Sequence, residues 1–184
     1  MDIDYERLRR AVAETVEHLE AGRKQPERSR KIELTVVRDL EVTISNGEYQ
    51  FGVDAAIDAG GEGKYARPMD YVLGGMLSCQ QMWCARWAAG RGLRFEALTL
   101  KAAGQFTWRG EYLDEVDSGL TSIDVEYHVR AASLSVTDAV DLADTVARRC
   151  PVFATLRKAT TINERIILNG EAVSSRTLSP PSHG

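Results

Sequence analysis

Hydrophobic residues first recur at helical spacing, near the start of the chain. Between Asp4 and Gly22 they stand three or four residues apart, and charged residues fill the positions between them. This pattern predicts an amphipathic helix that ends at Gly22, followed by a polar connector to residue 30. Because acidic residues in this helix offset the basic ones, we interpret residues 1–30 as a packing or dimer-contact extension and not as a nucleic-acid-binding arm.

The spacing changes to every second residue between Lys31 and Ile57. This alternation predicts β-strands, and Asn46–Gly47 is a residue pair typical of a hairpin turn. Apolar residues on one face of such a sheet must be covered by another apolar surface. The following stretch, residues 59–67, is rich in glycine but does not match a phosphate-binding loop, so we expect a flexible approach to the next helix.

A long and unusually apolar helix is predicted from Pro68 to about Ala89. Proline is favoured at the first position of a helix, and Gly90 follows the last apolar residue. Gly74 and Gly75 should weaken this helix by about 1 kcal/mol each relative to alanine, which favours another backbone packing close to them. Since several sides of the helix are apolar, we expect it in the core or at a subunit interface.

The rest of the chain predicts further strands and one more long helix. Strand patterns span residues 93–108 and 119–131, with an acidic loop at 110–118 between them. A helix opens at Ser133 or Ser135 and continues to Arg149, and Ser135 with Asp138 resembles a capping box. A helical turn to residue 158 and a strand at 160–168 follow. Because strands cluster and do not alternate with helices, we predict an α+β fold with a mainly antiparallel sheet, a domain at residues 31–170 and a flexible tail at 171–184.

Composition narrows the functional classes. The chain has 184 residues, of which 43% are hydrophobic and 27% charged, as in an ordinary globular domain. A net charge of −4 argues against nucleic acid as a partner, and the absence of a long apolar stretch argues against a membrane span. The acidic N-terminus does not resemble a signal peptide, so we expect a cytoplasmic protein. The three histidines do not stand near cysteines at zinc-binding spacing, so we expect neither a metal nor another cofactor.

Three cysteines remain as candidates for chemistry: Cys79, Cys84 and Cys150. In an intact helix, Cys79 and Cys84 would point roughly 140° apart, with α-carbons about 8 Å apart, which disfavours a disulfide between them and makes Cys84 a core residue. Cys150 ends a helix and precedes Pro151. If the two helices pack together, Cys79 and Cys150 could form a redox pair; otherwise they are two independent core cysteines, and the spacing leaves both possibilities open.

Two segments together resemble a known family. The segments PMDYVLGGMLSC (68–79) and RCPVFATL (149–156), with the glycine-rich loop before the first, look like the OsmC/Ohr family of thiol peroxidases over about residues 31–168. The resemblance implies an antiparallel sheet that wraps a long central helix, in an intertwined homodimer whose sites form between subunits. It also implies an antioxidant role: the reduction of organic hydroperoxides, with no cofactor beyond the protein's thiols.

The same resemblance implies roles for individual residues. Cys79 would attack the peroxide and become a sulfenic acid, and Cys150 would condense with it to a disulfide. A dithiol donor, for example of the lipoyl type, would reduce this disulfide. An arginine held by a glutamate would activate the thiolate. Glu62 matches the position of this glutamate, and Arg38 and Arg67 are candidates for the arginine, although both are typical surface residues.

Two other residues have alternative interpretations, and so does the whole protein. Trp83 and Trp87 could line an apolar substrate pocket beside Cys79, but core packing is the simpler interpretation. The protein could also be a non-catalytic OsmC-like binding or dimeric scaffold protein. A thiol hydrolase or acyltransferase with Cys79 as nucleophile is a third hypothesis and the weakest, because no motif positions a histidine base.

Overall fold

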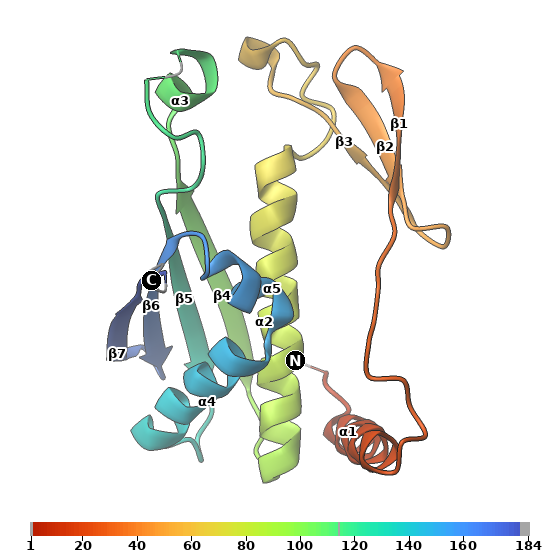
Figure 1. The fold of residues 1–184 in the computed structure, drawn as a ribbon. Helices are drawn as coiled ribbons and strands as arrows, with labels where there is room; N and C mark the ends of the chain where they lie inside the picture. Colours follow the sequence, from red (N-terminus) through yellow and green to blue (C-terminus); the bar gives the residue numbers. More distant parts are fainter. Residues whose placement is uncertain (1, 114, 181–184) are drawn as a thin grey trace. The chain divides into compact units, whose positions relative to one another are not determined.

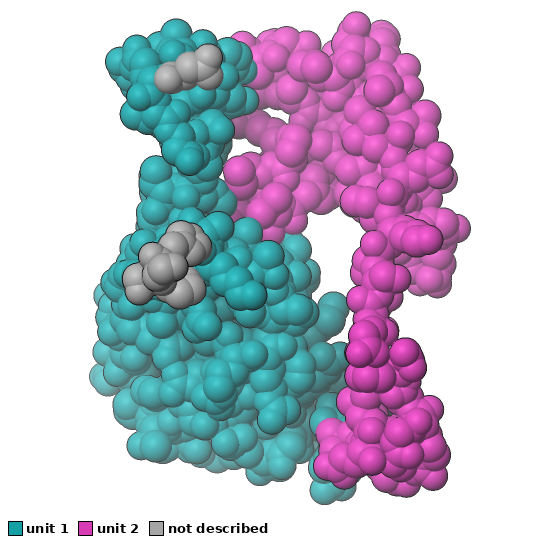
Figure 2. Space-filling model, viewed as in Figure 1, with its two compact units in different colours: residues 1–14, 75–184 teal, residues 15–74 magenta. Residues whose placement is uncertain are grey.

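The structure is a computed structural model that describes residues 2–113 and 115–180. The chain forms two compact units. One contains residues 15–74, and the other contains residues 1–14 and 75–184 (Figure 2). Figure 1 shows the order of the helices and strands along the chain.

The unit of residues 15–74 contains a three-stranded antiparallel sheet. Its strands are β1 (Glu33–Arg38), β2 (Glu41–Ser45) and β3 (Gln50–Val53), in the order β1-β2-β3. The hairpin predicted at Asn46–Gly47 is confirmed: Ser45 pairs with Gln50, and the Asn46 side chain accepts hydrogen bonds from the backbone of residues 48 and 49. Gly47 has φ 90°, a conformation that glycine adopts without strain.

A buried carboxylate organises the loop between this sheet and the next helix. The Asp54 side chain accepts hydrogen bonds from the backbone N–H groups of Ala55, Glu62 and Lys64. A side chain at Gly61 would come within 2.2 Å of the Ala55 carbonyl oxygen, so only glycine fits there. The expectation of a flexible approach is therefore wrong, because this carboxylate satisfies the loop's backbone donors and holds it in one conformation.

Two helices flank this region in the sequence, α1 (Tyr5–Glu20) and α2 (Pro68–Arg91), and both were predicted. Tyr5 fixes the start of α1, because its buried hydroxyl accepts a hydrogen bond from the Phe95 backbone N–H at 3.0 Å. The buried positions of α2 lie between residues 76 and 89. A side chain at Gly74 or Gly75 would meet nothing within 4 Å, so the described chain itself provides no closely packed backbone there.

The second sheet has four strands in the order β4-β5-β6-β7. They are β4 (Ala97–Gln105), β5 (Ser122–Arg130), β6 (Thr161–Leu168) and β7 (Glu171–Leu178). The pairs β4–β5 and β6–β7 are antiparallel, and β5–β6 is parallel. The prediction of an α+β fold with a mainly antiparallel sheet is confirmed.

Strand β7 corrects the expected tail at residues 171–184. Residues 171–178 pair with β6, and the turn before them contains Asn169 and Gly170, both with positive φ, 51° and 93°. This Asn-Gly pair is a hairpin signal that the sequence contains and that our sequence analysis did not use. The last four residues of the expected tail, 181–184, lie outside the described residues.

The connection between β4 and β5 also differs from the prediction. We expected an acidic loop at residues 110–118, but a short helix, α3 (Trp108–Leu113), occupies its first half. A side chain at the buried Gly110 would come within 2.7 Å of two backbone carbonyl oxygens, those of Val116 and Asp117. Residues 116 and 117 therefore fold back closely over this helix.

Two helices connect the parallel strands β5 and β6: α4 (Val136–Arg149) and α5 (Pro151–Leu156). The capping box before α4 is confirmed, because the Ser135 side chain accepts a hydrogen bond from the Asp138 N–H and the Asp138 carboxylate accepts one from the Ser135 N–H. The buried face of α4 packs on β6 and β7. No helix within the described residues is long and apolar enough to cross a lipid bilayer.

Candidate active site

One stripe of α2 faces α4. The indole Nε1 of Trp87 donates to the carboxylate of Asp141 at 2.7 Å, and the guanidinium of Arg91 donates to the same oxygen at 2.5 Å. One turn earlier on α2, the ring of Trp83 lies 5.7 Å from the guanidinium of Arg149 at the end of α4. Because residues four apart share a helix face, these contacts define the side of α2 on which α4 packs.

The same contacts show that the two helices run in opposite directions. Residues 91 and 87 of α2 meet residue 141 of α4, and residue 83 meets residue 149. Cys79 lies one turn before Trp83 on α2, and Cys150 directly follows Arg149, the last residue of α4. These contacts therefore place two cysteines that are far apart in the sequence in the same region of the fold.

Cys79 lies close enough to Cys150 to affect its titration. Burial, and next a hydrogen bond with the Cys79 side chain, raise the pKa of Cys150 to about 12, and the charge of Cys79 acts in the same direction. Cys150 is fully buried and caps α5, where its sulfur accepts a hydrogen bond from the Phe153 backbone N–H at 3.4 Å. Cys79 is half-buried, so it is the member of the pair that solvent reaches.

Cys84 is the third thiol of the cluster and is fully buried, as predicted for a core residue. Burial, and next the charge of Cys150, raise its pKa to about 12. All three cysteines are free thiols. Within residues 2–113 and 115–180, no three histidine, cysteine or acidic side chains are grouped so that they could bind a metal ion.

Glu62 and Arg38 meet in the unit of residues 15–74. Their side chains form an ion pair, and the Arg38 guanidinium also lies 3.7 Å from the Asp39 carboxylate. The backbone of Glu62 is held by Asp54, so the glutamate projects from an ordered loop. Of the two arginines proposed from the sequence as the partner of Glu62, the structure pairs Arg38 with it.

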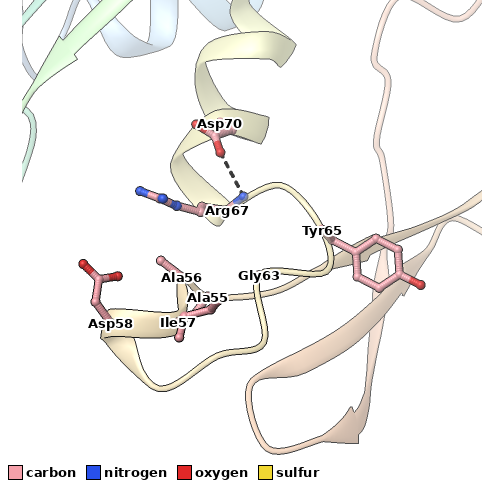
Figure 3. A pocket seen from close by; sticks show the side chains of 8 residues that line it. All are labelled: Ala55, Ala56, Ile57, Asp58, Gly63, Tyr65, Arg67 and Asp70. Carbon is pink, nitrogen blue, oxygen red and sulfur yellow. Dashed lines mark hydrogen bonds between the residues drawn. The ribbon is translucent and has the colours of Figure 1, made fainter.

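Arg67, the other candidate, lines a hollow in the same unit. This hollow has a volume of about 510 Å³ (Figure 3). The backbone N–H of Arg67 donates to the Asp70 carboxylate at 3.0 Å, which satisfies a donor at the start of α2. None of the three cysteines contributes to the lining, whose members are Ala55, Ala56, Ile57, Asp58, Gly63, Tyr65, Arg67 and Asp70.

Sequence reasoning did not find that two arginines contact Trp83, one helical turn from Cys79 on α2. Arg86 and Arg149 both stack on Trp83, with guanidinium carbons 5.1 and 5.7 Å from its ring. Arg86 stands seven residues after Cys79, which is two helical turns, so helical spacing alone could have placed it on the same face. Trp87 is a core residue, as expected, whereas Trp83 remains partly exposed.

The fold is α+β, and its candidate site consists of Cys79, on a long helix, and Cys150, at the end of a second one. A family model described as "OsmC-like protein" matches residues 61–165, which is more than half of the chain. The chain therefore belongs to the OsmC-like family. No curated protein sequence matches it significantly.

Solved structures agree with this fold. An OsmC-like protein from Mycoplasma pneumoniae superposes with a TM-score of 0.67 at 21% identity, covering 77% of this chain and 98% of the other. Two organic hydroperoxide resistance proteins are also similar. The one from Elizabethkingia anophelis has a TM-score of 0.60 at 18% identity, covering 79% and 100%, and the one from Legionella pneumophila has 0.58 at 15%, covering 77% and 98%.

Proposed function

We propose that this protein is a thiol-dependent peroxidase that reduces organic hydroperoxides. The observation that most supports this function is that the half-buried Cys79 lies close enough to the buried Cys150 to raise its pKa. Family membership and the names of two structural neighbours, organic hydroperoxide resistance proteins, point to the same chemistry.

The proposed reaction has two steps on the protein. The Cys79 thiolate attacks one peroxide oxygen, the O–O bond breaks, and the alcohol leaves after taking a proton, so that Cys79 becomes a sulfenic acid. The Cys150 sulfur then attacks the Cys79 sulfur. A disulfide forms, and the sulfenic hydroxyl leaves as water with the proton of the Cys150 thiol.

The difference in burial between the two thiols supports their proposed order. With a pKa of about 12, Cys150 holds its proton at neutral pH and is buried, so it does not compete for peroxide. Cys79 is accessible to solvent and to a substrate. A dithiol donor, of which lipoyl-type dithiols are an example, would return both cysteines to thiols by exchange, and the cytoplasm would supply it.

We propose that the Arg38–Glu62 ion pair stabilises the Cys79 thiolate. A guanidinium near a thiol lowers its pKa by favouring the charged form, and the glutamate would hold the arginine in position. In the homodimer that we propose, a second copy would complete the site. Apolar side chains exposed on and beside the three-stranded sheet support such a partner surface: Ile32, Leu34, Val36, Val37 and Leu40.

A thiol titration with tert-butyl hydroperoxide tests this function. The wild-type protein should lose two thiols per chain after one equivalent of peroxide, and dihydrolipoate should restore both. Cys150→Ser should stop at a sulfenic acid that dimedone traps, and Cys79→Ser should consume no peroxide. Cys84→Ser is the matched control and should behave like the wild type.

The proposal would be wrong if the wild-type protein consumed no peroxide or if Cys79→Ser consumed it at the parent rate. A non-catalytic OsmC-like binding protein would then be the better interpretation. Sedimentation of a Leu34→Glu variant tests the dimer separately, because a charge on this exposed strand should shift the protein towards monomer if the strand is buried by a second copy.

A further inference from the structure

A buried chain of hydrogen bonds begins at the residue next to Cys79. The side-chain amide of Gln80, on α2, donates to the hydroxyl of Tyr127 on β5 at 2.9 Å. That hydroxyl in turn donates to the carboxylate of Glu164 on β6 at 3.1 Å. The helical turn that contains Cys79 is therefore tied to the middle of the sheet.

The other end of the chain reaches the helix that precedes Cys150. The Nε of Arg176, on β7, donates to the second carboxylate oxygen of Glu164 at 2.5 Å. Its Nη1 donates to the carboxylate of Asp144 on α4. Asp144 stands six residues before Cys150. The hydrogen bonds therefore connect α2, which contains Cys79, to α4, which ends just before Cys150, through strands β5, β6 and β7.

This chain, Gln80–Tyr127–Glu164–Arg176–Asp144, is called the brace below. Its central members are almost completely removed from solvent: Gln80 is 0% exposed, Tyr127 1% and Glu164 2%. Burial raises the pKa of Glu164, although the charge of Arg176 acts in the opposite direction. Two buried atoms, Gln80 Oε1 and Arg176 Nη2, have no hydrogen-bond partner within the described residues.

Stability alone does not explain such a network. Buried ion pairs and unpaired buried polar atoms are costly, and apolar side chains of similar volume often stabilise a core as well or better. Hydrogen bonds do, however, define distance and direction closely. Gln80 stands about 100° around the helix from Cys79, so a rotation or slide of α2 that moved Cys79 away from Cys150 would also break the Gln80–Tyr127 bond.

We propose that Gln80, Tyr127, Glu164 and Arg176 are positioning residues that hold Cys79 and Cys150 within bonding reach. The brace rests on the proposed dithiol function, and it adds residues that take no part in the bond changes themselves. It acts on the second step, in which the Cys150 sulfur attacks the Cys79 sulfenic sulfur and water leaves. Attack on the peroxide involves only Cys79 among the three cysteines and is expected to be insensitive to the brace.

The strands contain a matched control network on their opposite face. The side chain of Asn163 on β6 donates to Asp124 on β5 at 2.9 Å and accepts from Thr177 on β7 at 2.9 Å. These positions alternate with those of the brace along the same three strands, so their side chains face away from it. Asn163→Ala removes two hydrogen bonds, as Tyr127→Phe does, but leaves the brace intact.

The first test does not depend on peroxide. The equilibrium between the reduced protein and its Cys79–Cys150 disulfide is measured in glutathione redox buffers for the wild type, Tyr127→Phe and Asn163→Ala. Looser positioning lowers the effective concentration of one thiol at the other, so Tyr127→Phe should lower the disulfide-forming equilibrium constant by about tenfold. The equilibrium constant of Asn163→Ala should stay within about twofold of the wild-type value, a difference too small to indicate that the thiols have lost their positioning.

The second test separates the two reaction steps by rapid mixing with tert-butyl hydroperoxide. In Tyr127→Phe, sulfenic acid should form at the wild-type rate and decay to the disulfide about ten times more slowly. Glu164→Gln retains the side-chain shape but removes the ion pair with Arg176. It should likewise form sulfenic acid at the wild-type rate and the disulfide more slowly, and it replaces Tyr127→Phe in the test if that variant does not fold. Absence of sulfenic acid in the wild type would contradict the peroxidase function only. An unchanged glutathione equilibrium in both brace variants, or an equal change in Asn163→Ala, would overturn the brace.

Discussion

The three cysteines should react with an alkylating reagent at very different rates. The pKa of Cys84 and that of Cys150 are raised to about 12 from an ordinary value of 9.0, chiefly by burial. Three pKa units reduce the thiolate fraction at pH 8 by about a thousandfold, and only the thiolate reacts. Cys79, which is half-buried, should therefore be modified first by iodoacetamide.

The assay is a time course at pH 8, quenched with acid, digested and quantified by mass spectrometry for each cysteine-containing peptide. Cys84 and Cys150 should remain unmodified while Cys79 reacts completely. All three should react at similar rates in 6 M guanidinium chloride, since unfolding removes the burial. Equal rates for Cys79 and Cys150 in the folded protein would refute the assignment of a buried, protonated resolving thiol.

The same pKa values predict how stability depends on alkaline pH. A thiol whose pKa is higher in the folded than in the unfolded state contributes its full stability at pH values below the unfolded pKa. Above that pH the thiol ionises in the unfolded state, which lowers the free energy of unfolding. The contribution of Cys84 and Cys150 should thus be complete below pH 9 and decline as the pH rises towards 12. Urea unfolding at pH 8 and at pH 10.5 should show a smaller decline for Cys84→Ala than for the wild type.

Further predictions concern the contacts that place the helices. Trp87→Phe removes the hydrogen bond to Asp141 and should lower the free energy of unfolding by about 1 kcal/mol, measured by urea titration, whereas an unchanged value would mean that the contact contributes nothing. Ser135→Ala removes the side-chain cap of α4 and should lower the same quantity by about 1 kcal/mol, with Ser135→Asp near the wild type. Tyr5→Phe leaves the Phe95 N–H without its partner and should accelerate tryptic cleavage within α1; an unchanged rate would show that this hydrogen bond does not hold the helix.

Local features of the chain could be predicted because their causes lie in neighbouring residues. Pro68 begins α2, Ser135 and Asp138 cap α4, and Asn46–Gly47 forms the hairpin turn, each through interactions that span a few positions. The alternating strand patterns and the two cysteine segments depend on equally short spacings. Strand β7 escaped prediction although its turn signal, Asn169–Gly170, is of the same local kind.

Only the tertiary structure decided what the buried polar residues of α2 and of the four-stranded sheet do. Gln80, Glu164 and Arg176 have no sequence pattern that separates them from solvent-exposed residues, and their hydrogen bonds join positions that are 12 to 47 residues apart. The stacking of Arg149 on Trp83 likewise requires α2 and α4 to pack in register.

By itself, then, the sequence determined the long helices, most strands, the fold class and the two candidate thiols, because short-range spacing and capping encode them. Packing between distant segments decided that Cys150 is buried while Cys79 is only half-buried. It also decided which polar side chains lie near them. Burial and electrostatics act through space, so the reactivity of Cys79 and Cys150 is a property of the assembled core and not of the residues beside them in the chain.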